Sequence, residues 1–185
     1  VEIIDRGRPS HPVFSKFIKV VGASSDPATD YSHIVNKFSL RDEFPSQCLL
    51  EAEELERTTD FNNLNNREDF TGLDTITIDP DSARDYDDAL SLRQNENGSF
   101  VVFVHISDVS HFVKVDSAID REARLRGTSV YFTDENIPMI PPTLTSNLCS
   151  LLPHKNRFTL TAVIELDKKL KVTGLDVKKG VINSN

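Results

Sequence analysis

The sequence is poor in cysteine and has no long apolar run, and both absences exclude whole classes of protein. Its two cysteines, Cys48 and Cys149, lie far apart and form no CxxC pair, so the sequence predicts no zinc site and no disulfide-linked partner. The longest apolar runs, such as residues 100–104, stop after about five residues, far short of the roughly 18 that a membrane span requires. The first residues also lack the basic and apolar pattern of a signal peptide. We therefore expect a cytoplasmic protein without membrane association, and the sequence indicates no oligomeric state.

The sequence also lacks the excess of basic residues that is typical of proteins that coat nucleic acids. Its net charge is −8 over 185 residues, which argues against such a protein. The objection weakens if the negative charge is concentrated at one site. Six aspartates do gather between Asp74 and Asp88, where Arg84 is the one basic residue.

A cluster of this kind needs a physical explanation. Two carboxylates about 4 Å apart repel each other by roughly 4 kcal/mol at an effective dielectric constant near 20. The carboxylates must therefore take up protons, spread into solvent or bind a cation. Strand-like apolar residues anchor the segment on both sides, at residues 76–78 and 89–90. A set of ligands made only of carboxylates favours Mg²⁺ or Mn²⁺ over zinc. From charge alone, a solvated acidic turn explains the cluster equally well.

The spacing of Asp79, Asp85, Asp87 and Asp88 suits two-metal chemistry on a phosphodiester. In that chemistry, ions about 3.5–4 Å apart activate a water and stabilise the leaving oxygen. One aspartate follows a predicted strand and three come at the start of the next. In an extended segment Asp85 and Asp87 share a face while Asp88 points away, so the four are not equivalent ligands.

Two other interpretations of the acidic segment can be compared with its spacing. An EF-hand needs ligands at alternate positions and then glycine, but Ala83 occupies a ligand position and the next glycine is Gly98. Residues 76–81 resemble the nucleophile strand of haloacid-dehalogenase-type phosphatases. That family normally has Thr or Val where this chain has Ala83, and no doubly wound β/α alternation follows. The spacing excludes the EF-hand and leaves the phosphatase as an alternative.

Hydrophobic spacing and turn residues predict a chain of the α+β class. Strands are expected at residues 1–4, 14–21, 75–78, 89–92, 100–106, 129–132, 158–166 and 170–177. Helices are expected at residues 31–38, 45–55, 116–126 and 144–148, and an exposed connector at residues 58–68. Pro45 is expected to be the first residue of the second helix. Asp116 is the expected N-cap of the third helix, which Gly127 should end.

Three blocks of the sequence resemble, in order, the motifs of the RNB catalytic domain of RNase II/RNase R exoribonucleases. Residues 77–89, TIDPDSARDYDDA, look like the signature that opens this domain. Residues 104–113, VHISDVSHFV, are similar to its VHIADVSHFV segment, with Ser107 for the usual alanine. Residues 126–151 contain RGTSVYF, PMIP and LCSL in the family's order.

The resemblance implies a domain organisation for the whole chain. It covers residues 73–185 strongly and residues 17–54 more loosely. It implies that residues 71–185 are the N-terminal part of an RNB catalytic domain, a mixed sheet with helices. Residues 25–70 are then a helical connector, and residues 1–24 the end of a cold-shock or OB-type β-barrel.

The resemblance also implies an activity. The family degrades single-stranded RNA processively from the 3′ end by metal-assisted hydrolysis and releases nucleoside monophosphates. It implies that Asp79, Asp85 and Asp88 hold Mg²⁺ or Mn²⁺, and that Asp87 serves the chemistry. It further implies that Tyr131 stacks on RNA bases, a contact that tolerates any sequence.

The family's catalytic arginine, a second stacking aromatic and a C-terminal RNA-binding barrel lie downstream of the residues matched here. Loss of a group that stabilises developing charge costs roughly 10²-fold or more in rate. We therefore expect this chain alone to be inactive or nearly so. The chief alternative is a truncated or degenerate relative that only binds RNA or metal, or that has a structural role.

Three arginines are candidate contacts to RNA phosphate. They are Arg124, Arg126 and Arg157. For Arg124 and Arg126, a role in complementing the C-terminus of a helix fits equally well.

Several other polar residues have structural interpretations. His105 and His111 lie beside apolar strand residues, and we expect both to be structural. Asp108 is expected to be a hydrogen-bonded turn residue, with orientation of a metal ligand as its alternative. Cys149, beside Ser150, is expected to be a buried thiol that packs in the core.

Overall fold

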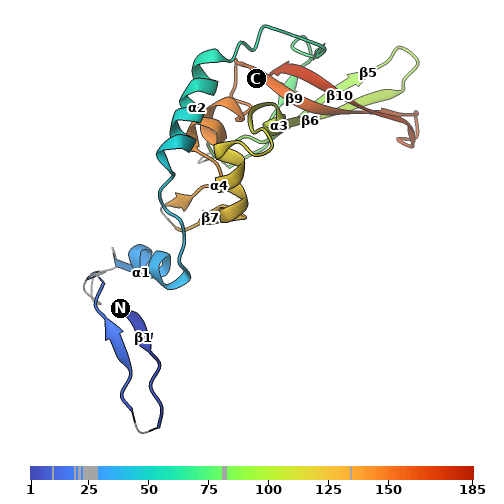
Figure 1. Ribbon diagram of the computed structural model, residues 1–185. Coiled ribbons are helices and arrows are strands. Elements are labelled where there is room, and N and C mark those ends of the chain that lie inside the picture. Colours follow the sequence, from blue (N-terminus) through green and yellow to red (C-terminus); the bar gives the residue numbers. More distant parts are fainter. Residues whose placement is uncertain (10, 19, 21, 23–28, 81–82, 134) are drawn as a thin grey trace. The chain divides into compact units, whose positions relative to one another are not determined.

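The computed structural model describes two compact units, Val1–Asp42 and Glu43–Asn185, each of which is considered by itself (Figure 1). The described residues are 1–9, 11–18, 20, 22, 29–80, 83–133 and 135–185. None of the helices among them is long and apolar enough to cross a membrane.

The first unit contains two strands and one helix. These are β1 (Glu2–Asp5), β2 (Phe14–Lys16) and α1 (Thr29–Phe38). The two strands pair antiparallel, so the predicted strands and helix are confirmed in position. The second strand ends at Lys16, and residues 19 and 21 of its predicted range lie outside the described residues. A two-stranded ribbon does not test the barrel over residues 1–24, which stays a prediction.

The second unit is built on a mixed sheet of six strands in the order β3-β10-β9-β6-β5-β4 (Figure 1). The strands are β3 (Glu68–Asp69), β4 (Thr75–Ile76), β5 (Asp88–Gln94), β6 (Phe100–Ser107), β9 (Asn156–Leu166) and β10 (Val172–Asn183). Neighbouring strands are antiparallel except β3 and β10, which are parallel. The prediction of a mixed sheet with helices is confirmed.

Two long hairpins supply most of this sheet. In the first, the turn from Asn95 to Gly98 joins β5 to β6, and Gly98 takes a φ of +80°, which favours glycine. The second hairpin joins β9 to β10, and β10 runs to Asn183, well beyond its predicted end at residue 177. It continues because Val181 and Ile182 are fully buried and pair with β9. The predicted strand at residues 75–78 is shorter than expected, since only its first half pairs with β5.

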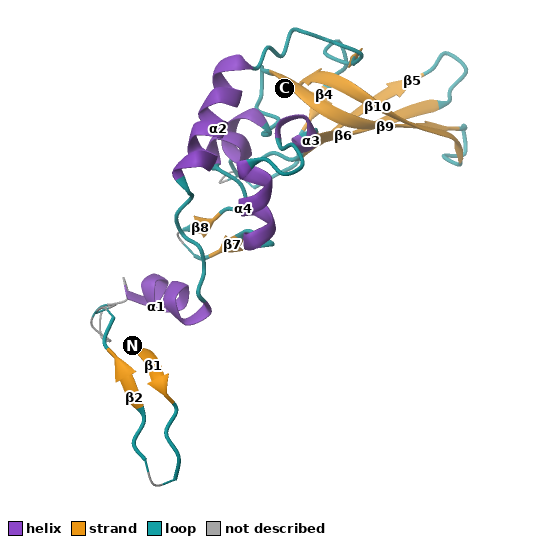
Figure 2. Cartoon of the chain, in the orientation of Figure 1, coloured by secondary structure: helices purple, strands orange, loops and turns teal. Residues whose placement is uncertain are grey.

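Four short helical segments pack at one end of the sheet (Figure 2). They are α2 (Ser46–Thr58), α3 (Val109–Phe112), α4 (Ala118–Arg126) and the π-helical turn η1 (Leu144–Leu148). The prediction for Pro45 was wrong by one position, because it is the extended N-cap of α2 and not its first residue. The N-cap of α4 is likewise Ser117, whose hydroxyl accepts from the Asp120 N–H, while Asp116 has a φ of +61°. Gly127 ends α4 in the left-handed conformation as predicted.

Two smaller elements complete the unit. β7 (Val130–Tyr131) confirms a predicted strand and pairs with β8 (Asn136–Ile137), which was not predicted. Helix α3 was not predicted either, because four residues are too few to show a helical period.

The core lies on both faces of the sheet. On one face Phe158 and Val181, which pair across β9 and β10, pack under the helices. The rest of this cluster includes Cys48, Ala52, Phe112, Ile119, Leu144, Leu148 and Cys149. On the other face, Phe103 and Ala89 pack with Phe70 and Ile182. Both cysteines are buried and free, which confirms the packing role expected for Cys149.

Candidate metal and RNA site

The acidic segment is held by the edge of the sheet. Asp88 is the first residue of β5 and pairs with Ile106 of β6. The carbonyl of Asp87 accepts a hydrogen bond of 2.9 Å from the Ser107 N–H, so β6 fixes the backbone of both aspartates. Asp79 comes three residues after the end of β4. The strand pair β4–β5 therefore brings the two ends of the segment to the same place, as the sequence predicts.

Two of the predicted aspartates, Asp79 and Asp87, lie close enough to Asp88 to change its pKa. The pKa of Asp88 is raised because partial burial disfavours its charged form and because Asp87 and Asp79 place negative charge beside it. A hydrogen bond with Asp87 shifts the pKa of Asp88 in the same direction. Close carboxylates thus share a small region at the start of β5.

One oxygen in this region has no partner. Oδ2 of Asp79 is buried and accepts no hydrogen bond within the described part of the chain. A buried carboxylate oxygen without a donor is unfavourable, and a hard divalent cation would relieve both this cost and the repulsion between the carboxylates. The donor set, which is all carboxylate oxygen, therefore fits Mg²⁺ or Mn²⁺.

The aspartates do not form a complete set of ligands. In the part of the chain that the structure describes, no three or more Asp, Glu, His or Cys side chains are close enough to hold an ion together. Asp81 lies outside the described residues. Asp85 is exposed and faces a small cavity of about 70 Å³.

Tyr131 lines the same cavity as Asp85. It lies on β7, and 69% of its surface is exposed. Tyr131 is therefore not packed in the core. An exposed aromatic ring beside an aspartate of the acidic segment is available to a base of a bound nucleic acid.

Arg126 was a candidate RNA contact, and the structure assigns it a structural role instead. Only 3% of its side chain is exposed. Its guanidinium donates to Glu122, 3.0 Å away, and to the carbonyls of Pro138 and Glu43, and it lies over the Phe44 ring at 3.7 Å. These partners come from distant segments, so the guanidinium joins α4 to two loops.

Arg157 is also buried, with 5% of its surface exposed, and it is likewise structural. Its Nε donates to the Ser150 carbonyl at 2.9 Å, and its other nitrogens donate to Asn156 and Asn147. Burial lowers the pKa of Arg157. Arg124 is different: it is exposed and forms an ion pair of 2.9 Å with Asp120 on the surface of α4.

His105 lies inside a chain of buried hydrogen bonds, so its expected structural role is confirmed. Its Nε2 lies 3.0 Å from the Ser91 hydroxyl and its Nδ1 lies 2.9 Å from the Thr161 hydroxyl. Thr75 and Thr159 extend this chain at its two ends. Burial lowers the pKa of His105 to about 4, so the ring is neutral near pH 7.

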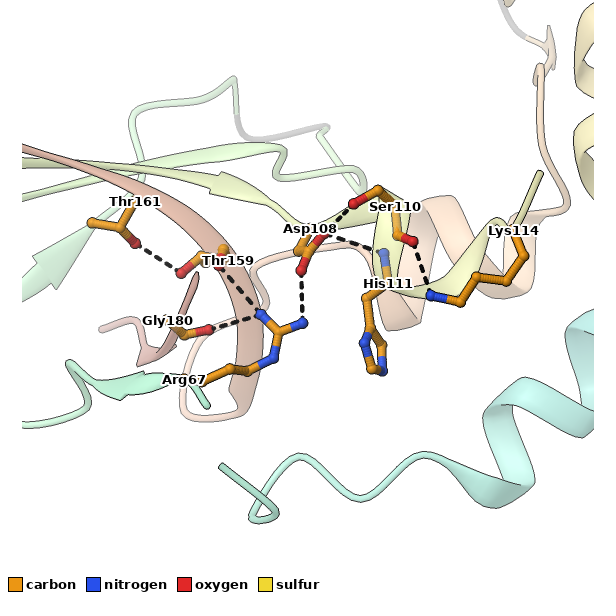
Figure 3. A network of polar contacts seen from close by, with 8 residues as sticks. All are labelled: Arg67, Asp108, Ser110, His111, Lys114, Thr159, Thr161 and Gly180. Carbon is orange, nitrogen blue, oxygen red and sulfur yellow. Dashed lines mark hydrogen bonds and ion pairs between the residues drawn. The ribbon is translucent and has the colours of Figure 1, made fainter. Parts of the chain in front are cut away.

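Asp108 lies at the centre of a polar network that sequence reasoning found only in part (Figure 3). As predicted, it is hydrogen-bonded at a turn: it accepts from the Ser110 hydroxyl at 2.7 Å and from the His111 N–H at 3.1 Å, and so caps α3. It also forms an ion pair of 2.6 Å with Arg67, and neither side chain is more than 5% exposed. Burial raises the pKa of Asp108, but the hydrogen bonds from Ser110 and Arg67 hold it below its ordinary value.

Arg67 is the important residue that the sequence did not reveal. It lies in the stretch predicted to be an exposed connector. Its guanidinium instead packs 4.2 Å from the Phe158 ring, and Nη1 points at the carbonyls of Thr159 and Gly180 (Figure 3). No local pattern marks such a residue, because its partners lie 41 or more positions away in the sequence.

Comparison with known proteins identifies the family. The RNB domain model matches residues 67–185. Ribonuclease R of Thermotoga maritima is 38% identical over 185 residues, which cover 99% of this chain and 26% of that protein. DIS3-like exonuclease 2 of Schizosaccharomyces pombe is 40% identical over 153 residues, which cover 83% of this chain and 15% of that protein. The chain therefore belongs to the RNB-domain family of exoribonucleases. Within this family it is similar to ribonucleases R, and it spans about a quarter of the length of the Thermotoga protein.

Solved structures agree with this assignment. Mycoplasma genitalium RNase R in complex with ribose-methylated single-stranded RNA superposes with a TM-score of 0.82 at 29% identity, over 91% of this chain and 26% of that chain. Yeast Ssd1, described as a pseudonuclease, superposes with a TM-score of 0.69 at 22% identity over 89% of this chain and 21% of its own, and shows the same fold. The predicted resemblance to the RNase II/RNase R family is confirmed, and the phosphatase alternative is set aside.

Proposed function

We propose that this chain supplies the metal-binding acidic segment of a 3′→5′ exoribonuclease. The enzyme hydrolyses single-stranded RNA processively to nucleoside monophosphates with Mg²⁺ or Mn²⁺. The observation that carries the proposal is the grouping of Asp79, Asp87 and Asp88, together with the buried oxygen of Asp79 that has no hydrogen-bond partner among the described residues. The relatives solved with single-stranded and double-stranded RNA support RNA as the substrate class.

In this proposal, Asp79, Asp85 and Asp88 would hold the metal. The bound metal would act as a Lewis acid on the scissile phosphate and lower the pKa of a water. Asp87, whose backbone is tied to β6, keeps its carboxylate beside Asp88. Tyr131 offers an exposed ring next to Asp85, where it would stack on a base and place the 3′-terminal phosphate near the aspartates.

A chimera tests this proposal in the setting of a whole enzyme. This chain would replace the aligned segment of Thermotoga maritima ribonuclease R, and the protein would be incubated with Mg²⁺ and single-stranded RNA. With a 5′ label, we expect the full-length RNA to be replaced by a short end product with few intermediates, and with a 3′ label the immediate release of a labelled mononucleotide. Asp87→Asn should abolish shortening while RNA binding persists. Asp176→Asn, a change at an exposed residue of β10, should leave RNA shortening unchanged.

The same experiment addresses the chief alternative. A folded chimera that retards RNA in a gel but leaves it at full length would overturn the nuclease proposal. That result would indicate a relative that binds RNA without cleaving it.

A further inference from the structure

Ser150 has no role in the proposed chemistry, yet its hydroxyl contacts the acidic segment. It lies two residues after η1 and is 1% exposed. Its Oγ accepts a hydrogen bond of 3.1 Å from the Tyr86 N–H and donates one of 2.9 Å to the Arg84 carbonyl. These two backbone groups lie on either side of Asp85.

We propose that Ser150 is a positioning residue for Asp85, and that it fixes the carboxylate of Asp85 for metal binding by holding the peptide units before and after it. The inference rests on the proposed function, because it takes Asp85 to be a metal ligand. Residues 83–86 belong to no helix or strand, and the ladder of β6 reaches only as far as the Asp87 carbonyl, so the sheet does not fix the backbone around Asp85. The Ser150 hydroxyl fixes the backbone on both sides of Asp85 instead.

A second contact strengthens the attachment. The Leu151 N–H donates to the Tyr86 carbonyl at 2.8 Å, so Ser150 and Leu151 together bind three backbone groups of the segment. Ser150 is itself held by Arg157, whose Nε donates to the Ser150 carbonyl at 2.9 Å. Ser150 therefore links the buried guanidinium of Arg157, through its carbonyl, to the loop around Asp85, through its hydroxyl.

The chemistry of the hydroxyl explains why serine suits this position. A hydroxyl donates one hydrogen bond and accepts others at the same atom, whereas alanine does neither. Ser150→Ala would leave the Tyr86 N–H and the Arg84 carbonyl without these partners and free the loop to move. Ser150→Thr keeps the hydroxyl.

The test measures Mn²⁺ affinity of the 185-residue chain by calorimetry, below the unfolding temperature of every variant. We expect Ser150→Ala to weaken Mn²⁺ binding by about tenfold or more, as loss of a residue that orients a ligand does. Ser150→Thr should stay within about threefold of the unaltered chain, by the same reasoning. In an Asp85→Asn background, Ser150→Ala should cause no further loss.

The matched control is Ser91→Ala. Ser91 is also buried, at 4% exposed, and its hydroxyl also has two partners, Thr75 and His105, away from Asp85. This variant should lose stability without losing Mn²⁺ affinity. Equal Mn²⁺ affinities for Ser150→Ala and Ser91→Ala would overturn the positioning role. If Asp79→Asn then lost Mn²⁺ affinity while Ser150→Ala did not, the proposed function would still stand. A chain that binds no Mn²⁺ at all would overturn both.

Discussion

At the scale of single residues, burial decides what a charged or polar side chain does. The four aspartates near β5 were singled out from the sequence because they form a motif, and among them the structure places Asp79 and Asp87 close enough to Asp88 to raise its pKa. The burial of Arg126 and Arg157 could not be predicted, because a basic side chain looks the same in a sequence whether it faces RNA or a buried carbonyl. Arg67 was missed for the same reason. Local sequence indicates which groups are present, and only the tertiary fold determines their partners.

His105 yields a prediction about pH. Its pKa is about 4 in the folded chain, against an ordinary value of 6.5. Between these two values the unfolded chain binds a proton that the folded chain does not. The free energy of unfolding should therefore fall as the pH drops from 6.5 to 4, by up to about 3 kcal/mol from this group. Urea denaturation at pH 7 and pH 5 measures the change.

Two variants isolate the contribution of His105. His105→Gln should reduce the difference in stability between pH 7 and pH 5, even if it lowers stability at both. His33→Gln, at an exposed residue of the first unit, should leave that difference unchanged. An unaltered pH dependence in His105→Gln would contradict the prediction.

At the scale of elements, the hairpins and α4 were predictable because their signals are local. The turn residues at Asn95–Gly98 directly follow β5, and the left-handed Gly127 directly follows α4. The extension of β10 was not predictable, because it depends on pairing with β9 and on burial of Val181 and Ile182. The strand β8 and the helix α3 are too short for a period to be visible.

The close packing of Gly180 in β10 against the Phe70 ring gives a prediction at this scale. A Cβ at Gly180 would lie 2.5 Å from Cδ2 of the buried Phe70 ring and 3.0 Å from the Thr159 hydroxyl. Gly180→Ala should therefore lower the free energy of unfolding by about 1–3 kcal/mol through overpacking. Chemical denaturation measures the loss. At Gly72 a Cβ would meet no described atom within 4 Å, so Gly72→Ala should be close to neutral. Equal effects at the two sites would argue against this packing.

At the scale of the whole molecule, the acidic segment links metal binding to folding. If the carboxylates gather around a cation only in the folded chain, a free ion at about 100 times its dissociation constant adds about 2.7 kcal/mol to stability. We expect Mg²⁺ to raise the melting temperature of the chain and EDTA to reverse the rise. Sodium chloride at equal ionic strength corrects for screening.

Variants show whether the stabilisation comes from the predicted site. Asp79→Asn should remove the rise in melting temperature caused by Mg²⁺, because it neutralises a carboxylate whose buried oxygen has no partner among the described residues. Asp176→Asn, at the exposed part of β10, should retain it. A rise that persists in Asp79→Asn would place the ion elsewhere.

The outer side of β10 has a consequence for how copies of the chain meet. Among the described residues, β3 pairs with only Gly180 and Val181, so the outer side of β10 from Val172 to Lys179 has no strand beside it, whereas β9 covers its inner side. An open edge of this length is a template for a further strand from another molecule. Lys178 and Lys179 lie on it, and burying an ammonium group beside an incoming apolar strand is unfavourable. The two lysines should therefore disfavour edge-to-edge pairing with another sheet, and neutralising them should favour such pairing.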